Sequence, residues 1–75
     1  MPTFNGWKNY QTWNVWLWTT NDEALYRVAR NHKTWAEYRL AIRELGIIET
    51  PDGVAFNDSG LDLPALDRAL KGSSR

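Results

Sequence analysis

HKTWAEYRLAIRELG, residues 32–46, decides the fold class, because it describes one amphipathic helix from its start to its end. Thr34 followed by Glu37 is a capping box, in which the two side chains satisfy backbone N–H groups left free at a helix start. Gly46 stands where a helix commonly ends on a left-handed residue. Between these ends the large apolar residues have the spacing of one buried helical face: Trp35, Tyr38, Ile42 and Leu45. We therefore predict a helix here, with this stripe in the core.

The preceding stretch, NYQTWNVWLWTT at residues 9–20, predicts a helix that is apolar on nearly every side. Asn9 is a suitable N-cap for a helix from Tyr10 to about Thr20. The residues with the i, i+3 and i+7 spacing of a buried face are Tyr10, Trp13 and Leu17. Further apolar residues point to the edge of that face or to other sides: Val15, Trp16 and Trp18. A helix of this kind is either central in its fold or covered by something else.

A second helix is expected at residues 21–31, NDEALYRVARN. Thr20 and Glu23 have the spacing of a capping box, and Asn21 and Asp22 also suit a helix start. The residues expected to face inward are Leu25, Val28 and Ala29. We expect the chain to change direction near residues 19–21.

Residues 47–56, IIETPDGVAF, contain a turn signal. Pro51 presets its own φ and Gly53 accepts a positive φ. Two structures fit this stretch: a tight hairpin of residues 47–49 against 54–56, or an irregular loop.

The last helix is predicted to start after Asp62, its N-cap. Pro64 falls in the first turn, where its missing N–H costs nothing. The face expected to point inward consists of Leu63, Leu66 and Leu70. Gly72 is expected to end the helix.

These elements predict an all-α fold, a compact domain of three or four helices with or without a very short β-hairpin around residues 47–56. We expect residues 1–75 to form one small helical domain, with an extended N-terminal arm at 1–8 and a frayed tail at 72–75. The chain has 75 residues, five Trp and no cysteine. Aromatic packing, oligomerisation or a partner must therefore supply the stability that disulfides or thiolate metal sites give other small domains.

The sequence indicates a soluble, intracellular protein rather than a membrane protein. Its start, MPTFNGWKNY, has neither the basic nor the apolar region of a signal peptide. No apolar run approaches the roughly 20 residues that a membrane span needs. The net charge is zero, with a basic excess in residues 1–43 and an acidic excess in residues 44–75. An overall basic nucleic-acid binder would look different. The uneven charge favours two halves that pack and attract each other weakly, and docking through complementary patches is the alternative.

Residues with catalytic or metal-binding chemistry are few. The sequence has no cysteine nucleophile, no glycine-rich phosphate loop and no pair of histidines at metal-ligand spacing. We expect His32 to be a surface or capping residue, and Asp58 and Asp62 to cap a helix rather than hold a cation. The prediction is a non-enzymatic protein with no catalytic residues, no cofactor and no metal.

The aromatic and arginine residues suggest a protein-binding surface. A fold this small cannot bury every Trp of the first helix, and Trp and Arg are enriched in binding hot spots. Leu40 points away from the buried stripe of the helix at 34–45, beside Arg43. The residues expected to bind a partner protein are Trp16, Trp18, Arg39, Leu40 and Arg43. For Trp18 a purely structural role is an equally open alternative.

Two other functions stay open. Basic residues interleaved with Trp and Tyr suit phosphate contact and base stacking, and here they are Arg27, Arg30, Lys33, Arg39 and Arg43. Against nucleic acid, the core stripe explains Trp35 and Tyr38 better, and a net charge of zero predicts a weak electrostatic contribution. The further alternative is a homodimer closed by the aromatic residues, which would enlarge a small core.

The stretch NYQTWNVWLWTTNDEALYR at residues 9–27 resembles a family of small phage, plasmid and bacterial proteins. Their shared motif is Tyr-x-Thr-Trp-Asn-Val-x-Leu-Trp, two residues, Asn-Asp/Glu, then Leu-Tyr. The matching residues are Tyr10, Thr12, Trp13, Asn14, Val15, Leu17, Trp18, Asn21, Asp22, Leu25 and Tyr26. Such proteins often continue with a TPDGV-like turn and a short acidic helix, as at residues 50–54 and 61–70. Trp16 departs from the pattern, since smaller residues are usual there.

The resemblance implies an origin in a virus or mobile element that acts in a bacterial cytoplasm. Small proteins from that source often bind a host protein or complex and inhibit or redirect it. The motif also has a structural interpretation, in which Thr12, Asn14, Asn21 and Asp22 satisfy free backbone N–H groups at helix starts.

Overall fold

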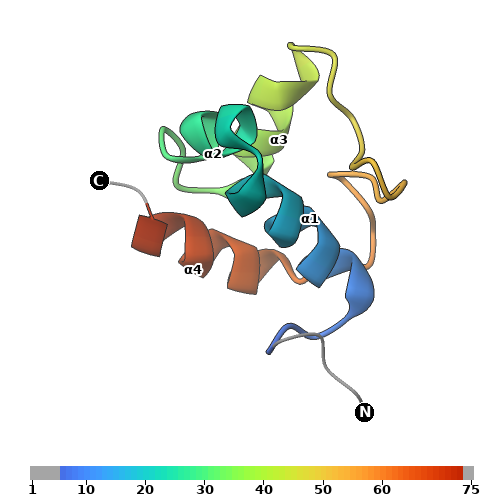
Figure 1. The fold of residues 1–75 in the computed structure, drawn as a ribbon. Helices are drawn as coiled ribbons and strands as arrows, with labels where there is room; N and C mark the ends of the chain where they lie inside the picture. The colour runs from blue at the N-terminus through green and yellow to red at the C-terminus, as the bar shows by residue number, and fades with distance from the viewer. Residues whose placement is uncertain (1–5, 74–75) are drawn as a thin grey trace.

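The computed structural model describes residues 6–73, and four α-helices form its framework (Figure 1). Their bounds are α1, Tyr10–Asn21; α2, Glu23–Ala29; α3, Trp35–Arg43; and α4, Leu63–Ser73. Figure 1 shows α1 crossing the middle of the molecule, with α2 and α3 above it and α4 below it in the view. The segment between α3 and α4 runs down one side. The predicted all-α class is confirmed.

The helix starts follow from short polar side chains. Asn9 accepts a hydrogen bond from the Thr12 N–H at 2.9 Å, and Thr34 accepts one from the Glu37 N–H at 3.3 Å, so both predicted N-caps are confirmed. The second helix is capped by Asp22, whose carboxylate accepts from the Leu25 N–H at 3.0 Å.

The predicted capping box of Thr20 and Glu23 is wrong, because α1 continues through Asn21. Thr20 therefore lies inside the last turn of α1, and its hydroxyl donates back to the Trp16 carbonyl at 3.1 Å. The change of direction falls at Asp22, whose extended backbone ends α1 and begins α2.

The buried face of α1 is the opposite of the predicted one. Thr12, Val15 and Thr19 are fully buried, and they have the same i, i+3 and i+7 spacing half a turn away. The predicted stripe instead faces outward: Tyr10 is 39% exposed, and Trp13 and Leu17 are half-buried.

The physical reason for this reversal is that the two threonines have hydrogen-bond partners on other elements. The Thr12 hydroxyl accepts from the Asp62 N–H at 3.0 Å, and the hydroxyls of Thr19 and Tyr38 are 2.9 Å apart. A buried hydroxyl with partners costs little, and its small side chain lets neighbouring segments approach α1 closely.

The core is centred on α3. Trp35, Tyr38 and Ile42 are fully buried, as predicted, and the ring centroids of Trp35 and Tyr38 are 4.8 Å apart. Phe56 stacks on Trp35 at 6.0 Å, and the indole N–H of Trp35 donates to the Phe56 carbonyl at 2.7 Å. Leu66 contributes from α4 with no exposed surface.

Leu45 does not belong to this core, because α3 ends at Arg43 before the stripe reaches it. Gly46, with φ +86°, donates to the Arg43 carbonyl at 2.9 Å, and Ile47 donates to the Ile42 carbonyl at 3.0 Å. These two bonds form a Schellman motif, which reverses the chain and packs Ile47 against the core in place of Leu45.

Residues 47–56 form a loop with one isolated antiparallel bridge, between Glu49 and Ala55. The predicted turn is present: the Gly53 N–H donates to the Thr50 carbonyl at 2.8 Å, and Gly53 has φ +88°. The Thr50 N–H donates to the Val54 carbonyl and the Phe56 N–H to the Ile48 carbonyl, as in a hairpin, but the pairing does not extend into strands.

The start of α4 agrees with the prediction, since the carboxylate of Asp62 accepts from the Ala65 N–H at 3.4 Å. Two other expectations are wrong. Leu63 is 48% exposed, because the first residue of a helix directs its side chain back past the helix end, and Leu61 is buried there instead. Gly72 does not end the helix, which continues to Ser73.

The predicted arm and tail lie partly outside the described residues. Of the arm, Gly6 to Lys8 are described, and Trp7 is half-buried against the core. Of the tail, Gly72 and Ser73 belong to α4, and residues 74–75 lie outside the described part, as do residues 1–5.

Candidate functional site

The two sequence motifs meet in one hydrogen-bond network. Asn14 is fully buried; its carbonyl oxygen accepts from the Thr50 hydroxyl at 2.7 Å, and its amide donates to Asp52 at 2.8 Å. The same carboxylate oxygen of Asp52 accepts from the indole N–H of Trp18 at 2.9 Å. These motif residues therefore hold the turn at 50–53 against α1.

Asp52 keeps its negative charge readily in this position. The hydrogen bonds from Trp18 and then from Asn14 favour the carboxylate and lower the pKa of Asp52 from its ordinary value. At neutral pH, the charged Asp52 carboxylate thus holds the turn at 50–53 to Asn14 and Trp18 of α1.

The interpretation of the motif as a set of helix caps holds for Asp22 at its own helix, and for Thr12 at the start of a different helix, α4. Thr12 serves the start of α4 through Asp62, as described above, and also donates to Asn9 at 2.6 Å. Asn14 contacts side chains of the distant turn rather than a helix start. Asn21 is exposed at the end of α1.

Trp16 and Trp18, two of the predicted binding residues, lie on different flanks of α1. Both are half-buried and pack against the core. Trp16 has its ring centroid 5.8 Å from that of Trp7, whereas Trp18 is bonded to Asp52 on the side of the turn. Residues two apart on a helix point in nearly opposite directions. The structure therefore does not bring the two tryptophans into one surface.

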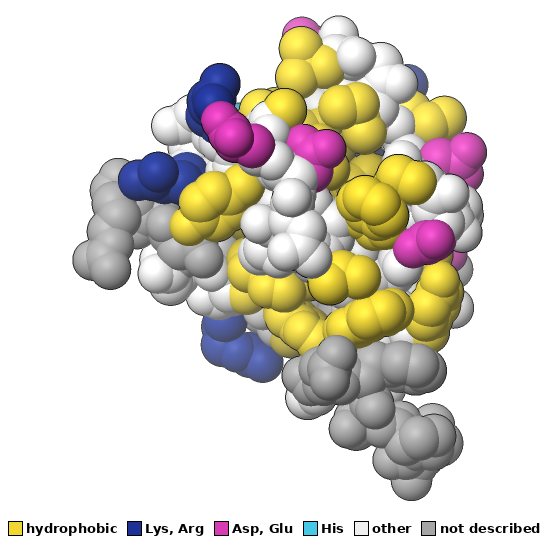
Figure 2. Space-filling view, viewed as in Figure 1, with side chains coloured by type: hydrophobic (Ala, Val, Ile, Leu, Met, Phe, Trp, Pro, Cys, Tyr) yellow, Lys and Arg dark blue, Asp and Glu magenta, His cyan; other side chains and the backbone are white. Residues whose placement is uncertain are grey.

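The face of α1 between them is rich in partly exposed aromatic rings. Figure 2 shows hydrophobic side chains gathered over α1 in the middle of this view, with Lys and Arg at the periphery. The rings pack partly on one another; those of Tyr10 and Trp13 are 5.7 Å apart. The largest exposed fractions lie elsewhere.

Three of the most exposed large hydrophobic residues lie close together in the sequence, on α3 and directly after it. Of the five such residues in the part of the chain that the structure describes, three lie within nine positions: Leu40 at 48%, Leu45 at 65% and Ile48 at 62%. Arg39, which is half-buried, and Arg43, which is exposed, belong to the same segment. We call these five residues the α3-end surface.

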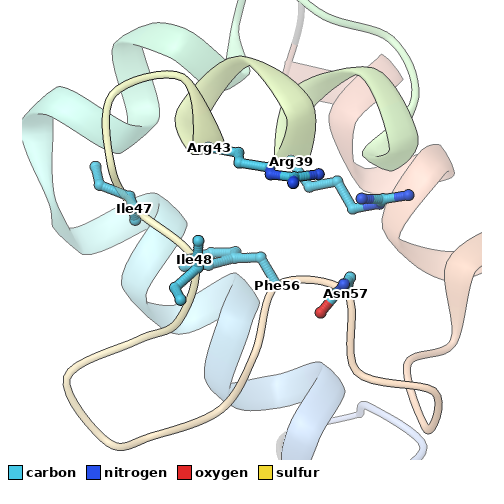
Figure 3. Close-up of a pocket in the computed structure, with 6 residues that line it drawn as sticks. All are labelled: Arg39, Arg43, Ile47, Ile48, Phe56 and Asn57. Atoms are coloured by element: carbon cyan, nitrogen blue, oxygen red, sulfur yellow. The ribbon is translucent and has the colours of Figure 1, made fainter.

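A small hollow opens beside the α3-end surface (Figure 3). Its volume is about 40 Å³, and it is lined by Arg39, Arg43, Ile47, Ile48, Phe56 and Asn57. In Figure 3 the two arginine side chains run along α3 in the same direction, on the side that faces Ile48 and Asn57. Two of the predicted residues, Arg39 and Arg43, thus border one hollow, and Leu40 is exposed on the same helix.

A second, larger groove of about 380 Å³ adjoins the chain segment that follows α3. Trp18 and Pro51 line it, together with the carboxylates of Asp22 and Glu49. Ile47 and Phe56 line both hollows. One hollow is therefore bordered by arginines and its neighbour by acidic residues.

The five basic residues of the nucleic-acid alternative fall into two groups. On α2, Arg27 pairs with Glu23 at 2.7 Å, and the guanidinium of Arg30 lies 5.8 Å from the centre of the Tyr26 ring. Lys33 is exposed after α2. Arg39 and Arg43 border the hollow on α3.

Groups with catalytic potential have structural partners in this fold. His32 lies at the end of α2, where its Nδ1 is 3.0 Å from the Val28 carbonyl oxygen, and Asp58 accepts from the Gly60 N–H at 2.7 Å. Within residues 6–73, no group of three or more His, Asp or Glu side chains is placed to hold a metal ion.

The hollow includes residues that sequence analysis missed: Ile47, Ile48, Phe56 and Asn57. One signal was available for two of them. Ile47 and Ile48 are adjacent apolar residues directly after a helix end, and neighbours in an extended segment point to opposite sides. One of the two therefore had to face away from the core.

The profile of a family of unknown function matches residues 1–68 of the chain. No curated protein and no solved structure matches it. Among the described residues, none of the helices has the length and apolar character required to span a bilayer.

Proposed function

The chain belongs to this family of unknown function, DUF7249, and from the structure of this member we propose that it is a non-enzymatic protein that binds a partner protein through the α3-end surface. The observation that carries the proposal is the exposure of Leu40, Leu45 and Ile48 within nine positions, with Ile48 lining the hollow that Arg39 and Arg43 border. Burying exposed aliphatic side chains against a partner lowers the free energy by about 25 cal/mol per Å² of apolar area removed from water. Clustered exposure of this kind marks interaction sites, and arginine is common in binding hot spots.

The partner is a host protein or complex of the bacterial cytoplasm, and binding modulates it, most directly by inhibition. The support for this step is the resemblance of residues 9–27 to proteins of phages and plasmids. A small domain without catalytic groups acts by occupying a surface that the partner needs.

A protein partner fits the α3-end surface better than nucleic acid does. Arg27 is already paired with Glu23 and Arg30 lies over Tyr26. Phosphate binding depends on many unpaired cations and on net positive charge, and this chain has a net charge of zero. The exposed aliphatic residues of α3 would have no role in contacting phosphate.

The proposal is tested by affinity capture from bacterial lysate after nuclease treatment, with the bound proteins identified by mass spectrometry. The structure offers a matched pair of variants, because Leu40 and Leu63 are equally exposed on different helices. We expect one host protein to be retained by the unchanged chain and by Leu63→Asp, and lost with Leu40→Asp and with Ile48→Asp.

Three results would contradict the proposal. Capture that disappears with nuclease would favour nucleic acid. A mass of two chains by light scattering, reduced to one by Leu40→Asp, would favour the homodimer. If Leu40→Asp and Ile48→Asp capture the host protein as well as the unchanged chain does, the binding surface lies elsewhere, and the aromatic face of α1 is the next candidate.

A further inference from the structure

We propose that the partner segment bound at the end of α3 is acidic and carries one bulky apolar side chain. One of its carboxylates lies between Arg39 and Arg43, and its apolar side chain enters the hollow lined by Ile48 and Phe56. This inference rests on the proposed protein-binding function and specifies the chemistry of the partner.

The two guanidinium groups point to an anion. Arg39 and Arg43 are one helical turn apart, and Figure 3 shows both side chains directed along the same side of α3. Like charges at i and i+4 disfavour each other. The ion pair found among the described residues is that of Arg27 with Glu23, so neither Arg39 nor Arg43 has a carboxylate partner there. A carboxylate placed between them relieves the repulsion and forms charge-assisted hydrogen bonds.

The hollow itself points to a protein side chain. Ile47, Ile48 and Phe56 make its lining largely apolar, and its volume is about 40 Å³. That volume admits the end of one side chain, whereas cofactors and drug-sized ligands need roughly 300–1,000 Å³. Phe56 is 2% exposed and is held by the core, so the floor of the hollow is rigid before a partner arrives. A preformed floor lowers the cost of ordering on binding.

The surrounding charges argue for carboxylates over phosphates. Glu44 and Glu49 are exposed on either side of the segment that contains Ile48. A nucleic-acid backbone repeats its negative charge at short intervals, so acidic residues along this segment repel it more strongly than they repel one carboxylate paired with the two arginines. The ring of Phe56 is buried and offers no face on which a base could stack.

The probe for this inference is a library of random 12-residue peptides displayed on phage and selected on the immobilised full chain. We expect enrichment of peptides in which Asp or Glu stands within a few residues of Leu, Ile, Met or Phe. An enriched peptide is then synthesised together with an analogue whose Asp and Glu are replaced by Asn and Gln. Fluorescence anisotropy should show tenfold or more weaker binding of the neutral analogue.

Two double variants localise the binding. The double variant Arg39→Gln with Arg43→Gln should bind the acidic peptide with tenfold or more lower affinity. The control, Arg27→Gln with Arg68→Gln, removes the same charge from α2 and α4 and should keep the affinity within about twofold of the unchanged chain. All four arginines are at least partly exposed, so circular dichroism should report unchanged helix content in both proteins.

The inference is overturned if no peptide is enriched, if the enriched peptides are basic or purely apolar, or if the two double variants weaken binding equally. These outcomes are separable from failure of the proposed function. If apolar peptides are enriched, and their binding is lost with Ile48→Asp but unchanged in the arginine variants, the acidic partner is rejected. The α3-end surface is then still supported. Lysate capture indifferent to Leu40→Asp and Ile48→Asp rejects the surface itself.

Discussion

At the scale of single residues, a few polar side chains connect segments far apart in the sequence. Asn14 joins α1 to Thr50 and Asp52, more than 30 positions away. Thr19 joins α1 to Tyr38 on α3. Because these groups are buried, removing one of them leaves its partners without a hydrogen bond in a low-dielectric interior, and that loss costs more than the bond itself contributes.

Asn14→Ala should therefore lower the free energy of unfolding by about 1–3 kcal/mol, since it removes a fully buried amide and leaves the buried Thr50 hydroxyl without its acceptor. The matched control is Asn31→Ala, which removes an exposed amide that donates to the Arg27 carbonyl. The control should change stability by no more than about 0.5 kcal/mol. Urea unfolding measures both, and equal effects would mean that the network is not a source of stability.

Tyr38 makes the stability of the fold sensitive to alkaline pH. Burial raises the pKa of Tyr38 to about 12, against the opposing effect of its hydrogen bond with Thr19. Between pH 10 and 12 the unfolded chain loses this proton while the folded chain retains it, so stability is complete below pH 10 and falls as the pH rises toward 12. The loss amounts to about 3 kcal/mol at 1.36 kcal/mol per pKa unit.

Urea unfolding at a series of pH values checks this expectation, with Tyr38→Phe as the comparison. The variant should show a smaller decline between pH 10 and 12, because it has no phenol to ionise. Absorbance at 295 nm should show one phenol of the folded protein ionising late, and its absence from the variant would assign it. Parallel declines in both proteins would refute the assignment to Tyr38.

At the scale of elements, helix ends decide which residues reach the core. The Schellman motif at Gly46 ends the stripe of α3 after Ile42 and turns Leu45 outward. Gly72, by contrast, lies within the last turn of α4 without a positive φ. Two glycines near helix ends thus have opposite conformational requirements.

Gly46→Ala should destabilise the protein by about 1–2 kcal/mol, the cost of a left-handed conformation with a Cβ atom. The open space around Gly46 leaves backbone strain as the cause, because an added Cβ would meet nothing within 4 Å. Gly72→Ala should stabilise by up to about 1 kcal/mol, since alanine favours a helix and the site is equally open. Thermal unfolding of the two variants should give shifts of opposite sign, and shifts of the same sign would contradict the described helix end.

At the scale of the whole molecule, α1 is the element to which distant segments are attached. Its buried polar side chains, Asn14, Thr12 and Thr19, bond to the turn at 50–53, to the start of α4 and to α3, respectively. The radius of gyration is 11.2 Å, as expected for a compact chain of this length. With these connections made through one helix, no part of the described chain has a core of its own.

Unfolding should consequently be a single cooperative transition. Far-ultraviolet circular dichroism reports the helices, and tryptophan fluorescence reports Trp35 in the core and the rings on α1. We expect both signals to give the same midpoint and the same dependence on urea. Distinct midpoints would indicate that α4 or the segment after α3 unfolds separately.

The sequence by itself determined the features that depend on neighbours within a few positions: the caps Asn9, Thr34 and Asp62, the turn at Pro51 to Gly53 and the buried stripe of α3. Each of these rests on a local hydrogen bond, a restricted φ or a helical period, all of which can be deduced from spacing. The predicted binding residues on α3 also lie together, because Arg39, Leu40 and Arg43 belong to one helix.

Only the tertiary structure decided which face of α1 is buried. That helix is apolar nearly all the way round, so its sequence pattern does not indicate one buried face. The buried face is determined by Thr12 and Thr19, which form hydrogen bonds with residues far along the chain. The same holds for the hollow beside the arginines, since Ile48 and Phe56 reach it by folding back onto α3. Long-range partners of this kind leave no trace in local spacing, which is why the site emerged only with the fold.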